Sequence, residues 1–288
     1  MGALFKQGDL MIYMFITNDL DMAEYAWESG VHRIFIDMEW MGKYERQGFL
    51  DTHMALSTSE DVSAIRKRLP EAEIMTRINP VHSESFMEID AAIEAGTDLI
   101  MLPMFNTADE VEKVIRLIDG RVRLNLLLET PQALTRIDDI LEYSAGIDEI
   151  HLGLNDLHLG MGLDFMFELL SGGIVEYAAR KIQNHDIRFG FGGIARVGRK
   201  DAVPARLIMG EHVRLGSEMV ILSRSFRLGI NDVKELRSRI NLRNEVERLD
   251  ECHNNFRKNS AKQLEENRRK LVIAVRNFVS SKREELTV

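Results

Sequence analysis

The segment from Arg123 to Leu157 reads RLNLLLETPQALTRIDDILEYSAGIDEIHLGLNDL, and its pattern decides the fold. A short apolar run, RLNLLL, is followed by a stretch with helical spacing, and a second apolar run, EIHLGL, begins at Glu149. Pro131 lies at the start of the helical stretch, where proline is common because the amide hydrogen that it lacks has no intrahelical partner. The segment therefore predicts a strand, a helix over TPQALTRIDDIL and a second strand.

The same alternation extends over most of the chain. Apolar runs of strand length begin at residues 10, 33, 73, 98, 123, 149, 188 and 219, and they read LMIYMF, RIFIDM, EIMTRI, DLIML, RLNLLL, EIHLGL, RFGFG and MVIL. Nearly continuous apolar character is typical of parallel strands that helices cover. Helices are expected between the runs, including one that ends at Gly96 and one from a Thr107 cap to Gly120. The repeated strand–helix unit predicts an α/β fold, a (β/α)8 TIM barrel over residues 1–230.

The remaining residues, 231–288, are strongly charged and have helical spacing, as in NEVERLDE and KQLEENRRKLVIAVRNF. An apolar stripe in the last helical stretch predicts a face that is buried against another element. The residues of this stripe are Leu264, Leu271, Val272, Val275, Phe278 and Val279. The C-terminal helices are therefore expected either to belong to the same domain or to form a contact in a homo-oligomer.

The composition argues against several classes of protein. Hydrophobic residues make up 45% and charged residues 29% of the chain, as in an ordinary globular protein. With 37 basic and 46 acidic residues, the net charge of -9 argues against a nucleic-acid binder, because phosphates are held by clustered Lys and Arg. No apolar run reaches the roughly 18 residues that span a membrane, and the first residues lack the pattern of a secretory signal. We expect a cytoplasmic protein with a small-molecule partner.

Charged side chains follow several predicted strands, where the mouth of a barrel lies. They are Asp37, Glu39, Arg77, Glu129 and Asp156. Glu129 and Asp156 lie one strand–helix unit apart, so adjacent strand ends would direct both carboxylates to one place. One or two carboxylates commonly hold Mg2+ or Mn2+ together with water or substrate oxygens. The spacing is compatible with a metal site, although such residues also cap helices or pair with one another.

Two stretches resemble the paired motifs of the HpcH/HpaI aldolase and citrate lyase β-subunit family. LNLLLETPQAL resembles the family's ETxxAL motif, and IDEIHLGLNDLHLGMG resembles its GxxDL motif. The similarity continues through MTRINP, DLIMLPMFNTADEVEKVI, GFGGIARV and LGSEMVILS, so that it covers roughly residues 33–228. Several motifs occur in the order that the family has, which makes the resemblance specific for the superfamily.

The resemblance implies a function and a set of site residues. Glu129 and Asp156 would bind a divalent metal, Mg2+ or Mn2+, and Gly153 and Asn155 of the second motif would contact the substrate. The reaction would be that of a carbon–carbon lyase, similar to a class II aldolase, on an α-keto acid such as pyruvate or oxaloacetate. Arg77 would bind the substrate and stabilise the oxygen that becomes negative in the enolate.

One string departs from the family pattern. Typical aldolases of the family have Asp-x-Glu-His after the second strand, and this histidine takes part in proton transfer. Here residues 37–40 read Asp-Met-Glu-Trp, and the indole of Trp40 cannot accept or deliver a proton at neutral pH. Asp37 and Glu39 are candidate catalytic residues. Three explanations stay open: a base such as Glu39, Glu45 or His82, a reaction such as decarboxylation that needs no base, or loss of catalysis.

The segment WMGKYERQGFLDTHMALST, which follows the second strand, is long and charged, as substrate-binding loops often are. We expect Lys43 and Arg46 to contact an anionic substrate. Two alternatives to an aldolase also stay open. The citrate lyase β-like branch of the family lacks the same histidine, which favours cleavage of an acyl-CoA thioester. A barrel that serves as a non-catalytic binding or scaffold subunit would explain Trp40 and the charged C-terminal helices.

Overall fold

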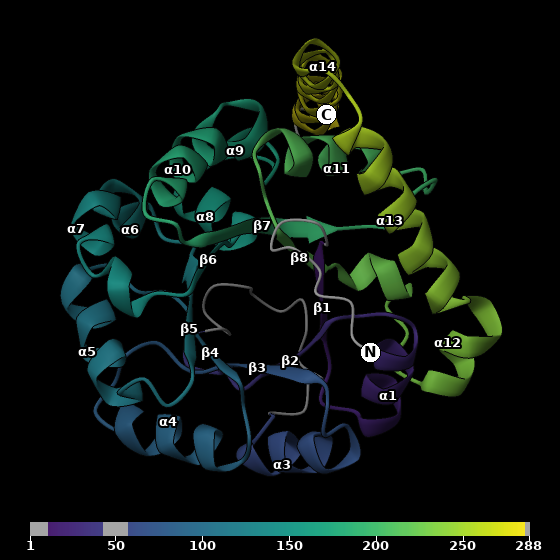
Figure 1. Cartoon of the computed structure of the whole chain (residues 1–288). Coiled ribbons are helices and arrows are strands. Elements are labelled where there is room, and N and C mark those ends of the chain that lie inside the picture. Colours follow the sequence, from purple (N-terminus) through teal and green to yellow (C-terminus); the bar gives the residue numbers. More distant parts are fainter. Residues whose placement is uncertain (1–10, 43–56, 286–288) are drawn as a thin grey trace.

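The structure is a computed structural model, and it describes residues 11–42 and 57–285. Eight parallel strands form a closed barrel in the order β1 to β8, and helices surround it (Figure 1). The strands are β1 (Ile12–Ile16), β2 (Arg33–Asp37), β3 (Glu73–Arg77), β4 (Leu99–Leu102), β5 (Arg123–Leu128), β6 (Glu149–Leu152), β7 (Arg188–Ile194) and β8 (Met219–Leu222). Each predicted apolar run overlaps one of these strands, and the predicted TIM barrel is confirmed.

The helices that cover the barrel follow the predicted capping signals. They are α1 (Leu20–Glu28), α3 (Ser59–Arg68), α4 (Ser85–Glu94), α5 (Ala108–Ile118), α6 (Pro131–Thr135), α7 (Ile137–Leu141), α8 (Leu154–Gly160), α9 (Glu168–Ser171), α10 (Ile174–Gln183) and α11 (Ala205–Arg214). Thr107 caps α5 by accepting a hydrogen bond from the Glu110 amide. The single helix predicted over TPQALTRIDDIL is divided into α6 and α7, because the backbone leaves the helical conformation at Arg136.

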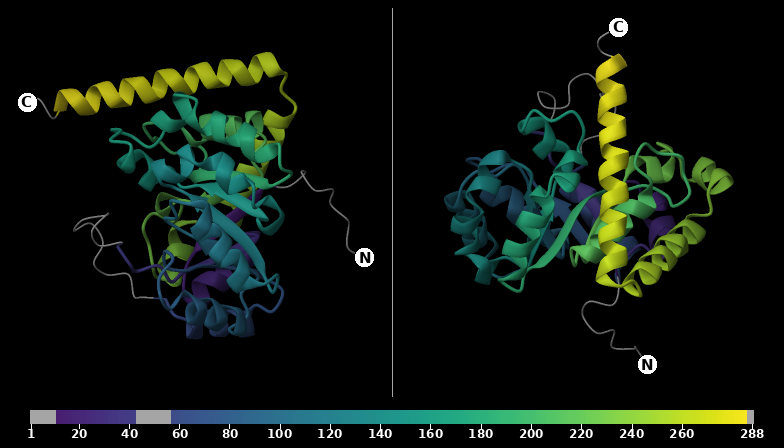
Figure 2. Two further views of the ribbon diagram at one scale, coloured as in Figure 1. Left: turned by 90° about the vertical axis from the view of Figure 1, so that its left-hand side faces the viewer. Right: turned by 90° about the horizontal axis from the view of Figure 1, so that it is seen from above.

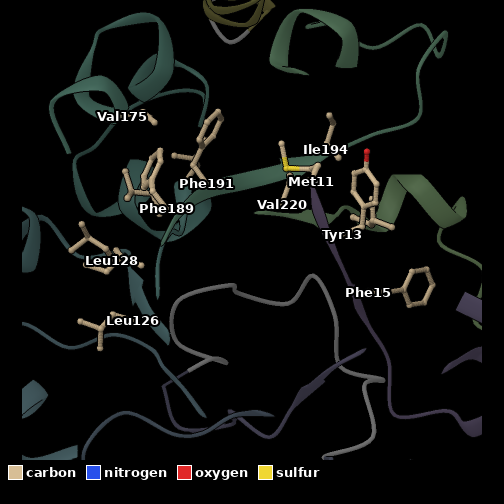
Figure 3. Close-up of a cluster of buried hydrophobic side chains, with 14 of the residues drawn as sticks. Met11, Tyr13, Phe15, Leu126, Leu128, Val175, Phe189, Phe191, Ile194 and Val220 are labelled. Atoms are coloured by element: carbon tan, nitrogen blue, oxygen red, sulfur yellow. The ribbon is translucent and has the colours of Figure 1, made fainter. Parts of the chain in front are cut away.

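Side chains alternate between the two faces of each strand, and the outward ones form the main hydrophobic core. Ile34 and Ile36 of β2 and Leu126 and Leu128 of β5 are buried in this core. Figure 3 shows part of it, with residues from β1, β5, β7 and β8 together with Val175 of α10. Burial of this surface between the strands and the surrounding helices stabilises the closed sheet.

The inward side chains form three layers. The lower layer is ionic, because Arg33 of β2 pairs with Glu149 of β6 (Nη1 to Oε2, 2.6 Å) and with Glu73 of β3 (Nε to Oε2, 2.5 Å). The middle layer is apolar and consists of Met14, Phe35, Met75, Leu99, Met101, Leu127 and Met219. Two residues further along β2 and β3, Asp37 and Arg77 face each other in the strand register. The apolar layer therefore separates the ionic lower layer from a second group of charges at the mouth.

Three helices follow the barrel: α12 (Val233–Arg239), α13 (Leu242–Arg257) and α14 (Ala261–Glu285). In Figure 2, α14 is a long straight helix that runs along the outside of the barrel. Leu271, Val275 and Val279 of the predicted stripe are buried, and α14 packs against α11 and α9 of its own chain. The domain boundary near residue 230 and the homo-oligomer stay predictions.

No helix within residues 11–42 and 57–285 has both the length and the apolar character that are needed to cross a membrane.

Candidate active site

A cavity of about 670 Å3 lies at the carboxyl ends of the strands. Five residues predicted from the sequence lie around it, namely Arg77, Glu129, Gly153, Asn155 and Asp156. The rest of the lining consists of Leu127, His151, Leu154, His158, Leu159, Met166, Gly192, Gly193, Ile221 and Arg224. The barrel therefore brings the predicted metal ligands and the predicted arginine to one place.

Arg77 reaches this cavity from the end of β3, and two carboxylates hold it. Its Nε and Nη2 donate to the two carboxylate oxygens of Asp37, at 2.8 and 2.7 Å, and Nη2 lies 3.4 Å from Glu39 Oε2. Burial opposes the charged form, but Asp37 and Glu39 raise the pKa of Arg77 above its ordinary value. Asp37 and Glu39 are themselves buried. These two predicted catalytic residues therefore lie in position to fix the guanidinium, and neither of them lines the cavity.

Glu129 follows β5 and is almost fully buried beside Gly153. Its Oε1 accepts a hydrogen bond from the Met104 amide at 3.2 Å. A Cβ atom at position 153 would come within 2.7 Å of Glu129 Oε2, so glycine is needed there for this close approach. Burial, together with the nearby carboxylates of Asp156 and Glu39, raises the pKa of Glu129 well above its ordinary value, although Arg77 opposes the shift.

Comparison with known proteins assigns the chain to a family. The model of the HpcH/HpaI aldolase/citrate lyase family matches residues 11–197. The chain belongs to this family. The matched residues include Arg77, Glu129 and Asp156. Membership in a family of aldolases and lyases supports an enzyme.

Several solved structures have the same fold. An HpcH/HpaI aldolase from Desulfitobacterium hafniense is 17% identical, with 80% of this chain and 90% of that chain covered and a TM-score of 0.60. A family protein from Burkholderia cenocepacia is 16% identical, with 80% and 96% covered and a TM-score of 0.60. The citrate synthase SbnG is 18% identical, with 76% and 88% covered and a TM-score of 0.58. At these identities the similarity shows the fold and not the reaction.

A short sequence match connects the chain to a different enzyme. A pyruvate kinase from Methylorubrum extorquens is 37% identical over 60 residues, which are 21% of this chain and 13% of that protein. Because the match spans so little of the kinase, it carries no conclusion about activity.

The carboxylates at the cavity have the chemistry of a hard-metal site. Within the described part of the chain, no three or more His, Cys, Asp and Glu side chains form a group that could hold a metal by themselves. Mg2+ and Mn2+ are commonly held by only one or two carboxylates, with water or substrate oxygens as the other ligands. Four carboxylates lie at the mouth, those of Asp37, Glu39, Glu129 and Asp156, and the cavity lining holds two guanidinium groups, Arg77 and Arg224. A divalent cation would offset the remaining excess of negative charge. Glu129 and Asp156 therefore fit such an ion.

Trp40 lies just after β2, outside the cavity. The Asn79 side-chain oxygen accepts hydrogen bonds from the Trp40 and Met41 amides, at 3.0 and 2.9 Å, and this fixes residues 40 and 41 beside the segment that follows β3. The indole is 58% exposed and is not part of the cavity lining. Of the alternative bases, His82 pairs with Glu88 (Nε2 to Oε2, 3.1 Å) and does not line the cavity either. Glu45 and the predicted substrate contacts Lys43 and Arg46 lie outside the described residues.

Two histidines that were not predicted to be functional from the sequence also line the cavity. His151 is fully buried in β6 and contacts the Gly192 carbonyl through Nε2 at 3.1 Å, and burial lowers its pKa to about 4. His158 contacts the carbonyls of Leu154 and Asn155 through Nδ1. Because a carbonyl only accepts, this nitrogen carries the hydrogen in the neutral ring. The alternation of β6 places His151 on the same face as Glu149, a signal that the sequence contains.

The raised pKa of Glu129 predicts that the stability of the folded protein depends on pH. A carboxyl group whose pKa is raised by folding favours the folded state at low pH, and this contribution is lost as the pH rises above the ordinary value of 4.5. Glu129→Gln is therefore expected to raise the Tm of the metal-free protein at about pH 8 and to leave it unchanged at about pH 4. Thermal denaturation followed by circular dichroism measures both values. Equal effects at the two pH values would contradict the prediction.

Proposed function

We propose that this protein is a divalent-metal-dependent carbon–carbon lyase that acts on an α-keto acid such as pyruvate or oxaloacetate. The observation that carries the proposal is that Glu129, Asp156 and Arg77 line one cavity at the mouth of a barrel that belongs to the HpcH/HpaI family. The cavity volume of about 670 Å3 is in the range of small-molecule sites. We also propose Mg2+ or Mn2+ as the cofactor.

Each residue has a distinct task in this proposal. Glu129 and Asp156 would hold the metal, which when bound supplies Lewis-acid polarisation of the keto group. Arg77 binds the keto acid and stabilises the negative charge that develops on its oxygen, since the ion pair with Asp37 uses Nε and Nη2 and leaves the Nη1 hydrogens for a ligand. Gly153 and Asn155 lie beside Glu129 and Asp156 and would orient the substrate.

The same residues support both cleavage and decarboxylation. In both reactions the bond that breaks joins the carbon next to the keto group to the following carbon. Its electron pair moves through the carbon next to the keto group toward the keto oxygen, which gives an enolate, and Arg77 offsets the resulting charge. Decarboxylation of oxaloacetate needs no base for this step. Aldol cleavage also needs an acceptor for the hydroxyl proton of the substrate. Decarboxylation is therefore the less demanding reaction for a site in which Trp40 replaces the histidine of the family.

Two reactions of the purified protein test the proposal. We expect exchange of the pyruvate methyl protons in deuterated water, followed by NMR, and decarboxylation of oxaloacetate, each dependent on Mg2+ or Mn2+ and stopped by a chelator. Because free metal ions also decarboxylate oxaloacetate, Asp156→Ala with the same metal is the control. Calorimetric titration with Mn2+ should show binding to the wild type and none to Glu129→Ala or Asp156→Ala. Failure of both reactions in a protein that binds the metal would refute the keto acid lyase.

A second candidate is the cleavage of an acyl-CoA thioester, as in the citrate lyase β-like branch. The exposed Trp40 at the position of the missing histidine favours it. Cleavage of an acyl-CoA, detected as a shorter acyl-CoA or as free thiol, without turnover of either keto acid, would support this alternative. Ligand binding without any turnover would support a non-catalytic barrel. The cytoplasmic location and the homo-oligomeric state stay predictions.

A further inference from the structure

The segment from 161 to 167, which joins α8 to α9, forms one wall of the cavity. Met166 lies in the cavity lining together with Leu159 of α8. The Glu168 carboxylate accepts hydrogen bonds from the amides of Asp164 and Phe165, both at 2.9 Å, and this fixes the turn of the wall. The wall is continuous with the helix that carries Asn155 and Asp156, so its position affects the space beside them.

The C-terminal helix contacts the outer side of this wall. The rings of Phe278 in α14 and Phe165 in the wall have centroids 4.3 Å apart, and Phe165 in turn packs edge-on against Phe167 at 5.2 Å. Lys282 Nζ donates to the Asp164 carbonyl at 2.8 Å, and Arg283 pairs with the Asp164 carboxylate at 2.6 Å. The Arg283 ion pair is largely exposed and contributes little, so the aromatic contact is the main anchor.

The first half of α14 is fixed to the barrel at a different place. Asn267 donates to the Leu207 carbonyl of α11 at 2.9 Å. It lies so close to Gly210 that a Cβ atom there would come within 2.3 Å of Asn267 Nδ2. Leu271 and Val275, the next residues on this face, are buried. The helix therefore connects α11 rigidly to the cavity wall, and it lies beyond residue 197, where the family match ends (Figure 2).

We propose that α14 is a clamp that holds the wall at 161–167 against the cavity, with Phe278 as its positioning residue, and that it thereby sets the affinity for the keto acid. The assignment of the ligand rests on the proposed function. The physical reason is that α14 contacts the outer side of this wall at Phe165 and Asp164, so removal of the Phe278 ring takes away the main contact and lets the wall move outward. A site whose wall moves no longer holds a small ligand in one orientation.

The clamp can be tested by NMR of the full chain labelled with methyl-13C methionine, with the Met166 signal assigned by Met166→Leu. Phe278→Ala is expected to shift or broaden this signal, and it should weaken binding of oxalate, an unreactive keto acid analogue, by about tenfold in the presence of Mg2+. Phe278→Leu should restore both properties. Ile273→Ala is the matched control, because it also shortens an apolar side chain of α14, and Ile273 is 58% exposed.

An unchanged Met166 signal in Phe278→Ala would overturn the clamp, and a changed signal with unchanged oxalate affinity would overturn its effect on the site. A fall in affinity that Ile273→Ala reproduces would also overturn it. Failure of the proposed function has a different signature: the wild type would catalyse neither pyruvate exchange nor oxaloacetate decarboxylation, whereas the comparison of Phe278→Ala with wild type would still show whether α14 holds the wall.

Discussion

Replacement of Arg77 with lysine is expected to lower the kcat/KM of pyruvate exchange by roughly 10²–10³-fold, the effect of removing one aligned donor to a developing oxyanion. Lysine keeps the positive charge but lacks the planar guanidinium group with its several fixed N–H donors. It therefore cannot make the two hydrogen bonds to Asp37 and still direct a fixed donor into the cavity. The loss should be measured by NMR of exchange at saturating metal.

Two controls separate this loss from damage to the metal site or to the fold. Arg77→Lys should bind Mn2+ with the affinity of the wild type, because Glu129 and Asp156 are unchanged. Arg224→Lys makes the same chemical change at another residue of the cavity lining, which is exposed, and should have a much smaller effect on exchange. Exchange within a few fold of wild type in Arg77→Lys would show that the guanidinium does not stabilise the reacting oxygen.

The barrel and half of its site could be predicted from the sequence for one physical reason. Parallel strands bring their carboxyl ends to one side, so the residues that follow each apolar run meet at the mouth whatever the details of packing. This argument places Arg77, Glu129 and Asp156 together from their order alone. It does not distinguish residues that face the cavity from those behind them, and the sequence therefore groups Asp37 and Glu39 with Arg77 as candidate catalytic residues.

Other parts of the site depend on packing that strand spacing does not specify. Met166 lines the cavity although it lies in the segment between α8 and α9 and does not directly follow a strand. The interaction that fixes this segment comes from Phe278, more than a hundred residues later in the chain. The apolar stripe of α14 predicted a buried face, but its pattern is equally compatible with a neighbouring subunit. Only the folded chain shows that Leu271 and Val275 pack on their own barrel.

The ionic lower layer was visible in the sequence but was not interpreted. Most of the predicted strands begin with a charged residue, among them Arg33, Glu73 and Glu149. Barrel closure places β2 opposite β6, so Arg33 meets a carboxylate 116 positions away in the chain. Arg33 is 0% exposed, and Glu149 also accepts hydrogen bonds from Asn125 and Arg188. Burial alone would raise the pKa of Glu149, but Arg33 and its neighbours hold it at about 2.

Arg33→Met is therefore expected to lower the free energy of unfolding by about 3–5 kcal/mol, because it leaves Glu149 charged and buried without its main partner. Urea denaturation at pH 7 measures this change.

The double variant Arg33→Met/Glu149→Leu should recover a large part of the loss, because an apolar pair of similar volume avoids the desolvation of both charges. Arg188→Met, at the partly exposed edge of the same network, should have a smaller effect, since Arg33 still neutralises Glu149. A loss below about 1 kcal/mol in Arg33→Met would mean that water or a shift of Arg188 compensates the buried carboxylate. The ionic layer would then contribute to strand register more than to stability.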